Sequence, residues 1–255
     1  MYIDTHCHLN FKEFDEDRAM VIGNAKKAGV KKFIIPGTNP ITSRSATALA
    51  ATDPITLFAS IGCHPYDTRN VPSRKDIERL ISKSTIAIGE CGLDYHLYGD
   101  EPAVGRKEEQ KQLFEMQLGI ALQYTLPVII HSRDAFDDIF DVLDSLPTMP
   151  KGVFHCFSGG LEQIRAIGSR GFFLGLDGNA TYSKQLKLVI PSIPLSMLLL
   201  ETDAPYLAPV GYRGERSEPK YIPLIAQTIA ELQNKSIQEV EETTTANARQ
   251  LFSLY

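Results

Sequence analysis

Short apolar runs alternate along the chain with longer segments whose apolar residues recur every three or four positions. Runs rich in Val, Ile, Leu and Phe favour buried β-strands, and the longer spacing favours amphipathic helices. We predict eight strands, at residues 2–8, 32–37, 57–64, 86–92, 127–132, 152–157, 172–177 and 198–203. We predict helices at residues 15–29, 41–51, 73–82, 106–124, 135–146, 161–171 and 183–190, with two or three more in 218–255.

Strands that alternate with helices predict a parallel sheet. Eight such units in 255 residues match the usual size of a closed (β/α)8 TIM barrel, so we expect this fold. An open doubly wound sheet is the alternative. The chain has no Gly/Ser-rich linker and no low-complexity tract, so residues 1–255 are expected to form a single domain.

Side chains that can bind metal follow the apolar part of six of the eight predicted strands. They are His6, His8, His64, Glu90, His131, His155 and Asp203. The active site of a TIM barrel lies at the C-terminal ends of its strands, so we expect these residues to meet at one rim. Several buried polar groups at one place would be very unfavourable unless they satisfied each other or bound metal.

The first two histidines stand two positions apart, in the run D-T-H-C-H-L at 4–9. Residues i and i+2 of a strand point to the same face, so His6 and His8 can bind one ion through neutral imidazoles. The same alternation places Asp4 in the lumen with them and turns Ile3 toward the helices. A lone H-x-H is more often a packing or surface feature, and only the further ligands at the other strand ends favour a metal site here.

Two further carboxylates, Asp4 and Glu201, are expected one layer below the rim, where they would orient the imidazoles. A purely structural polar cluster is an equal alternative for Glu201. By strand alternation Ile88 is also expected in the lumen together with Glu90. The four cysteines form no C-x-x-C pair and adjoin these polar residues, so we expect them to be small apolar packing groups behind the site.

Four histidines and two carboxylates exceed what one catalytic ion needs, which is about three protein ligands. Two divalent cations roughly 3.5 to 4 Å apart, bridged by a carboxylate, fit the set better and would activate a water for hydrolysis. Two such ions, less two carboxylates and one hydroxide, leave a site of about +1 charge, which favours an anionic substrate such as a phosphodiester. A neutral ester or amide is not excluded.

Charge and composition limit the classes of molecule that the protein is expected to bind. With 26 Lys and Arg against 31 Asp and Glu, the net charge of −5 provides no overall basic field for long duplex nucleic acid. The N-terminal residues lack the pattern of a signal peptide and no run is long enough to span a membrane, so we expect a cytoplasmic enzyme with no membrane partner and no obligate protein partner. No G-x-S-x-G, P-loop or H-E-x-x-H motif occurs.

The segment 204–219 is too rich in Pro and Gly for regular structure and follows the eighth predicted strand. Long loops at that end of a barrel often carry function. Aromatic and basic residues of this loop and its flank are candidates to stack on a base or hold a phosphate: Tyr206, Tyr212, Arg213, Arg216 and Lys220. A solvated loop with scattered charges is the alternative, and His96 is expected at the surface.

Further motifs continue the pattern over nearly the whole chain. They are G-C-H-P at 62–65, I-G-E-C-G-L-D-Y at 88–95, H-S-R-D-A at 131–135, H-C-F-S-G at 155–159, E-T-D-A-P-Y-L-A-P at 201–209, R-G-E-R-S-E-P at 213–219 and T-T-A-N-A-R-Q-L-F at 244–252. Together with D-T-H-C-H-L, they resemble the TatD-related metal-dependent deoxyribonucleases of the amidohydrolase-like barrels.

The resemblance implies a first metal on His6, His8, Glu90 and Asp203, and a second on Glu90, His131 and His155. It further implies that Asp203 accepts a proton from the attacking water and that His64, helped by Arg133, contacts a phosphate. The roles of Asp177 and Asn179 stay open.

The implied activity is hydrolysis of DNA from the 3′ end with two divalent ions, among which Mg, Zn, Mn and Co remain open. Hydrolysis of an ester or amide, such as removal of a D-amino acid from tRNA, is the alternative, because fold does not determine substrate. A non-catalytic barrel is disfavoured by the full set of ligands.

Overall fold

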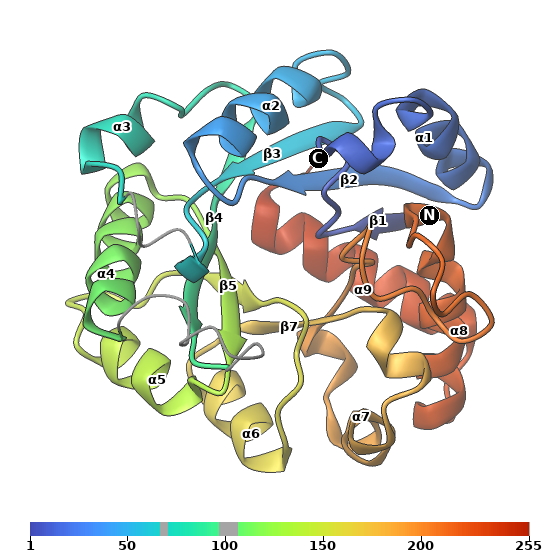
Figure 1. The fold of residues 1–255 in the computed structure, drawn as a ribbon. Helices are drawn as coiled ribbons and strands as arrows, with labels where there is room; N and C mark the ends of the chain where they lie inside the picture. The colour runs from blue at the N-terminus through green and yellow to red at the C-terminus, as the bar shows by residue number, and fades with distance from the viewer. Residues whose placement is uncertain (67–70, 97–106, 255) are drawn as a thin grey trace.

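Eight parallel strands follow one another around a barrel in the order of the sequence (Figure 1). The computed structural model describes residues 1–66, 71–96 and 107–254. The strands are β1 (Tyr2–Asp4), β2 (Val30–Pro36), β3 (Leu57–Ile61), β4 (Thr85–Asp94), β5 (Val128–Arg133), β6 (Gly152–Phe154), β7 (Phe173–Leu176) and β8 (Leu198–Leu200). Residues 106 and 255, at the ends of two predicted helical segments, lie outside the described residues.

Helices cover the outside of the barrel. They are α1 (Arg18–Lys27), α2 (Pro40–Ala50), α3 (Arg74–Glu78), α4 (Lys107–Tyr124), α5 (Phe136–Asp144), α6 (Leu161–Ser169), α7 (Lys184–Val189), α8 (Ile222–Gln233) and α9 (Ile237–Phe252). Short 3-10 helices lie at Lys12–Phe14, Gly178–Thr181, Ile190–Ser192, Leu195–Met197 and Pro219–Tyr221. No helix within the described ranges is long and apolar enough to cross a membrane.

The first and last strands close the barrel. The Thr5 amide donates to the Leu200 carbonyl at 3.0 Å, and Cys7 pairs with Ala204 in an isolated parallel bridge. This closure confirms the predicted (β/α)8 TIM barrel. The alternative prediction of an open doubly wound sheet is wrong. Because the strands are parallel, all their C-terminal ends lie at the same rim.

Apolar side chains fill the lower barrel, and α9 closes it from below. Ile3, Ile34, Ile129 and Leu199 from four strands pack in one buried cluster with the α9 residue Leu251. Figure 1 shows α9, in red, passing behind the centre of the barrel. The lumen is therefore solid at its N-terminal end, and polar residues can gather only at the opposite rim.

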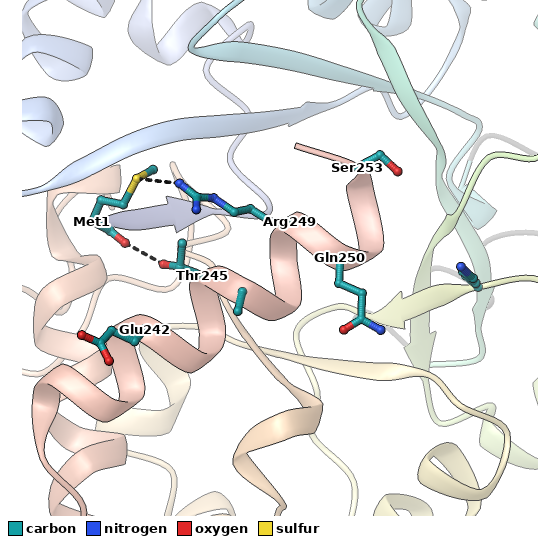
Figure 2. Close-up of a pocket in the computed structure, with 8 residues that line it drawn as sticks. Met1, Glu242, Thr245, Arg249, Gln250 and Ser253 are labelled. Carbon is teal, nitrogen blue, oxygen red and sulfur yellow. Dashed lines mark hydrogen bonds between the residues drawn. The ribbon is translucent and has the colours of Figure 1, made fainter. Parts of the chain in front are cut away.

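The closed end of the barrel carries a surface cavity of about 760 Å³ (Figure 2). Its lining includes Met1, whose carbonyl accepts a hydrogen bond from the Thr245 hydroxyl at 2.6 Å, and Arg249. None of the predicted metal ligands lines it.

Strict alternation along the strands is wrong at two positions. Ile3 packs inside the barrel rather than toward the helices, and Ile88 belongs to the outer core rather than the lumen. β1 ends at Asp4, so regular alternation does not continue from Ile3 to His6, and in β4 the register of the sheet shifts between Ile88 and Cys91. An irregular register changes which face the next side chain occupies.

Candidate metal centre

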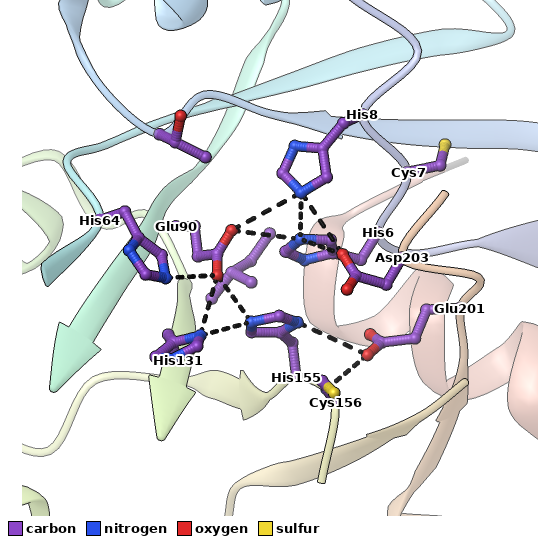
Figure 3. A network of polar contacts seen from close by, with 12 residues as sticks. His6, Cys7, His8, His64, Glu90, His131, His155, Cys156, Glu201 and Asp203 are labelled. Atoms are coloured by element: carbon purple, nitrogen blue, oxygen red, sulfur yellow. Dashed lines mark hydrogen bonds and ion pairs between the residues drawn. The ribbon is translucent and has the colours of Figure 1, made fainter. Parts of the chain in front are cut away.

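Seven side chains from six strand ends converge at the C-terminal rim (Figure 3). Glu90 and His131 stand on β4 and β5, whereas β1, β3, β6 and β8 end before their histidines and Asp203. The segments just beyond those strands are tied to neighbours: the Asp203 amide donates to the His6 carbonyl at 2.9 Å, and the His155 amide donates to the Ile130 carbonyl at 3.0 Å. The site is thus built on backbone that the barrel holds in place.

Glu90 lies at the centre of this cluster, and its two oxygens face different histidines. Oε2 lies 3.4 Å from Nε2 of His6 and 3.8 Å from Nε2 of His8. Oε1 lies 2.8 Å from Nε2 of His155 and 3.1 Å from Nδ1 of His131. A carboxylate with one oxygen toward each of two ligand sets has the geometry of a bridge.

The first ligand set consists of His6, His8 and Asp203. The two Nε2 atoms are 3.3 Å apart, and Oδ1 of Asp203 lies 3.6 Å from Nε2 of His6 and 3.4 Å from Nε2 of His8. One ligand atom from each of the three residues lies within 4.8 Å of the others, close enough to bind one ion. Two imidazole nitrogens and a carboxylate oxygen are ordinary ligands of zinc-type cations.

The second ligand set surrounds Oε1 of Glu90. Nδ1 of His131 lies 3.3 Å from Nε2 of His155, and Nε2 of His64 also lies near, 3.4 Å from Oε1. However, Nδ1 of His64 accepts a hydrogen bond from the Tyr66 amide at 3.1 Å, so Nε2 of His64 carries the proton. A protonated nitrogen donates a hydrogen bond and cannot bind metal, which supports the phosphate-contact role for His64.

Burial and charge leave the cluster ready for a cation. Burial lowers the pKa of His6, and it lowers the pKa of His64 to about 3 with help from nearby His131, so both rings are neutral at pH 7. Burial raises the pKa of the Glu90 and Asp203 carboxyls, but the surrounding histidines outweigh it. They hold the pKa of Glu90 well below its usual range and that of Asp203 below its usual range. Burial also lowers the pKa of His131 and His155, but the carboxylates beside them outweigh it and raise both, so a divalent cation bound here would displace protons from these two rings.

The residues present therefore fit a divalent metal. Nε2 of His6, His8 and His155 all face the carboxylate of Glu90 in one buried space. A cation there could accept the lone pairs of these nitrogens and of the carboxylate oxygens together. Groups of three His, Asp or Glu ligands with atoms near enough for an ion occur at this rim.

One polar residue of this site has no counterpart among the predicted ligands. Asp94 is only 1% exposed, and its Oδ2 lies 2.9 Å from Nε2 of His131. It orients that ring with Nδ1 toward Glu90, as outer carboxylates commonly orient metal-bound histidines. The available signal was its spacing, since Asp94 follows Glu90 by four residues on the same strand.

The two carboxylates expected beneath the rim behave differently. Asp4 accepts the amides of His6 at 3.2 Å and Thr202 at 3.1 Å and the Thr202 hydroxyl at 2.6 Å, so it holds backbone and the prediction that it orients an imidazole is wrong. Glu201 lies under His155, with Oε1 3.7 Å from Nδ1 of that ring.

Two of the basic residues predicted to meet a phosphate are used inside the protein. Arg216 pairs with Asp17 at 2.6 Å, and Lys220 pairs with Glu218 at 2.8 Å. Both cations are thus already paired within the protein, which leaves them less available to a phosphate. Arg133 and Arg213 are exposed, Arg133 at the end of β5 and Arg213 with its guanidinium 4.3 Å from the centre of the Tyr182 ring.

Other polar and sulfur-bearing residues lie largely as expected. His96 lies 2.8 Å from Asp134, where both side chains are substantially exposed, in agreement with a surface position. Cys7, Cys63 and Cys91 are buried, as predicted for packing groups. Cys156 differs, because it is only partly buried and its backbone φ is 46°, which turns the chain immediately after His155.

Gly175 leaves the space that Glu201 occupies, and its replacement by alanine should destabilise the fold. An added Cβ would lie 2.3 Å from Oε2 of Glu201, whose other oxygen is held by the Cys156 amide. We expect Gly175→Ala to lower the free energy of unfolding by about 1–3 kcal/mol in urea titrations, because the core cannot accept the methyl without strain. Gly23→Ala is the matched control: it meets nothing within 4 Å in α1 and should stabilise by about 0.5–1 kcal/mol. An unchanged Gly175→Ala midpoint would contradict this prediction.

Comparison with known proteins agrees with the geometry of the site. The family model for TatD-related DNases matches residues 3–253. The uncharacterized metal-dependent hydrolase YabD of Bacillus subtilis is 36% identical over 262 residues and 100% of both chains, and the 3′-5′ ssDNA/RNA exonuclease TatD of Erwinia billingiae is 36% identical over 98% of both. The crystal structure of YJJV, a TatD homolog from Escherichia coli, superposes with a TM-score of 0.90 at 34% identity, covering 100% of this chain and 98% of that one. By its sequence along nearly its full length, its barrel and its cluster of histidines and carboxylates, the chain belongs to the family of TatD-related DNases.

Proposed function

We propose that the protein is a metal-dependent phosphodiesterase that removes nucleotides from the 3′ end of DNA with two divalent ions. The observation that carries this proposal is the orientation of Glu90, whose Oε2 faces His6 and whose Oε1 faces His155. The exonuclease function named for the Erwinia billingiae relative supports a nucleic-acid substrate.

The residues divide the chemistry between them. Bound at this rim, divalent ions would supply Lewis acidity for the attacking water and for the phosphate. Asp203, whose side chain is 13% exposed and lies beside His8, accepts the proton of the water that attacks phosphorus. His64 donates a hydrogen bond from its Nε2–H group to a phosphate oxygen as charge develops there. Arg133 and Arg213 hold the flanking phosphates from the surface of the rim.

Tyr206 offers a surface for the terminal base. The ring is 51% exposed and its centre lies 6.2 Å from that of His8, so it borders the first ligand set. Stacking of a base on an aromatic ring contributes about 1–3 kcal/mol, so Tyr206→Ala should raise KM for a single-stranded oligonucleotide by roughly 5- to 100-fold. Tyr206→Phe should restore most of the affinity. An alanine variant with unchanged KM would remove Tyr206 from substrate binding.

The metal and the bond class are tested together by an activity panel. Protein stripped with a chelator is reloaded with Mg, Mn, Zn or Co and assayed on single-stranded DNA, RNA, duplex DNA and an aminoacyl ester. We expect cleavage of single-stranded DNA that releases mononucleotides from the 3′ end. Loaded protein that leaves DNA intact but hydrolyses the aminoacyl ester would overturn the nuclease assignment in favour of the ester or amide hydrolase. Failure to bind any divalent ion would indicate a non-catalytic barrel.

A further inference from the structure

Three buried polar atoms lie below the metal ligands with no hydrogen-bond partner among the described residues. They are Nδ1 of His6, Nδ1 of His155 and Oε2 of Glu201. The two imidazole rings stack in parallel, with centres 4.0 Å apart and an angle of 7° between their planes. One ring nitrogen of each histidine and a carboxylate oxygen of Glu201 all lie within 4.8 Å of one another. Buried polar groups are rarely left unpaired, so their convergence calls for an explanation.

The two histidines belong to different ligand sets. Nε2 of His6 faces Oε2 of Glu90 and Asp203, whereas Nε2 of His155 faces Oε1 of Glu90 and His131. Each ring therefore turns its Nε2 up toward the rim and has only Nδ1 left for a partner below. Figure 3 shows Glu201 on the side of His155 away from Glu90. A single carboxylate thus lies beneath one ligand of each set.

Glu201 has little freedom to move from this position. Its residue is fully buried, and Oε1 accepts the Cys156 amide at 2.5 Å and lies 3.7 Å from Nδ1 of His155. Gly175 leaves room for Oε2 that any other side chain would fill. A buried carboxylate with one oxygen tied to the backbone and the other unpaired is available to accept protons from imidazole nitrogens.

We propose that Glu201 is a positioning residue shared by both metal sites. It accepts the Nδ1–H of His155 and of His6, directly or through one water molecule, and so keeps the Nε2 lone pair of both rings toward the ions. The inference rests on the proposed two-metal function. Asp94 orients His131 by holding its Nε2 atom, so that ring belongs to the second ligand set only, whereas Glu201 lies beneath one ligand of each set.

The test is Glu201→Gln, because glutamine keeps the size of the side chain but presents an NH₂ group. The neutral amide holds ring protons on Nδ1 less strongly than the carboxylate does. An NH₂ group at the Oε2 position would also make a facing Nδ1 an acceptor, which places the ring proton on Nε2 and blocks metal binding. We expect both Mn²⁺ affinities, measured by equilibrium dialysis of chelator-stripped protein, to fall together by about 10- to 100-fold. The electron paramagnetic resonance signal of a coupled manganese pair should disappear at an ion concentration that saturates the unchanged protein.

Asp177→Asn is the matched control, because Asp177 is also buried near Cys156 but accepts the Asn179 amide at 2.6 Å. It should lower the unfolding temperature without lowering the affinity for either ion more than about threefold, which is less than the loss of a group that orients a metal ligand causes. If Glu201→Gln weakens only the ion of the second set, Glu201 serves His155 alone and the shared role is overturned. If it lowers the unfolding temperature of stripped protein and leaves both affinities unchanged, its role is structural.

The metal measurements separate this inference from the proposed function. Unchanged protein that binds two ions but cleaves no nucleic acid would overturn the phosphodiesterase proposal and leave the Glu201 comparison intact. Two ions that bind unchanged in Glu201→Gln, with normal nuclease activity, would overturn only the inference.

Discussion

Replacing Asp203 with asparagine should lower kcat on single-stranded DNA by roughly a thousandfold or more, because the proposed mechanism then loses its proton acceptor and a negative metal ligand at once. Oδ1 of Asp203 lies 3.6 Å from Nε2 of His6 and 3.4 Å from Nε2 of His8, so it completes the first ligand set. Its backbone φ of 52° is a conformation that aspartate and asparagine both tolerate, so the fold should survive the change. Steady-state kinetics and metal content of the same preparation give the measurement.

The control for Asp203→Asn is Asp134→Asn. Asp134 also follows a barrel strand and also has a positive φ, of 53°, but it pairs with His96 at the surface. The control should keep kcat within about twofold, since exposed ion pairs contribute little. Retention of more than a tenth of kcat by Asp203→Asn, with both ions bound, would remove Asp203 from proton transfer.

The sequence was sufficient to predict which residues meet. Parallel strands end at one rim, so His131 and His155, 24 residues apart, had to approach each other once the barrel was recognised. Family resemblance then added the division of the ligands into two sets. Both conclusions depend on the order of strands, which the alternation of apolar runs reveals.

The alternation of apolar and polar residues did not predict the direction of individual side chains at the rim. Four of the strands end before their site residues, and Cys156 and Asp203 have positive φ, so the period of two no longer applies there. Asp4 illustrates the consequence, because it turns to the Thr202 amide instead of to a ring. Asp94 was not predicted as a site residue, because the carboxylate of Asp94 joins the site only through its contact with the His131 ring in the folded protein.

The ion pairs of basic residues in and beside the loop after β8 also could not be predicted from the sequence. Arg216 and Lys220 looked available for phosphate because a single sequence does not tell which charges pair. Arg216 reaches Asp17, nearly two hundred residues earlier in the chain, and both oxygens of that carboxylate accept from it. Such bidentate pairs depend on the closure of the barrel, which brings the loop against the segment before α1.

Replacing Glu90 with glutamine should abolish the proposed site for two metal ions. Each Glu90 oxygen faces its own ligand set, and a glutamine side chain has only one oxygen that can bind a cation. We expect bound Mn²⁺ to fall from two ions to one or fewer, and kcat on single-stranded DNA to fall by at least about a hundredfold, since even outer-shell changes commonly remove that much. Equilibrium dialysis and the manganese resonance signal measure the first effect, and oligonucleotide cleavage measures the second.

The double variant His6→Ala/His8→Ala provides the comparison for Glu90→Gln. It removes two ligands from the set that includes Asp203 but leaves His131, His155 and Glu90 in place, so one ion should survive where Glu90→Gln perturbs both. The two variants together then separate a bridging carboxylate from a ligand of one ion. Two ions retained in Glu90→Gln would show that Glu90 is not the bridge, and two ions at full occupancy in the double variant would refute the division of the ligands. Loss of every ion from the double variant would mean that Glu90, His131 and His155 bind an ion only when the first ligand set is also occupied.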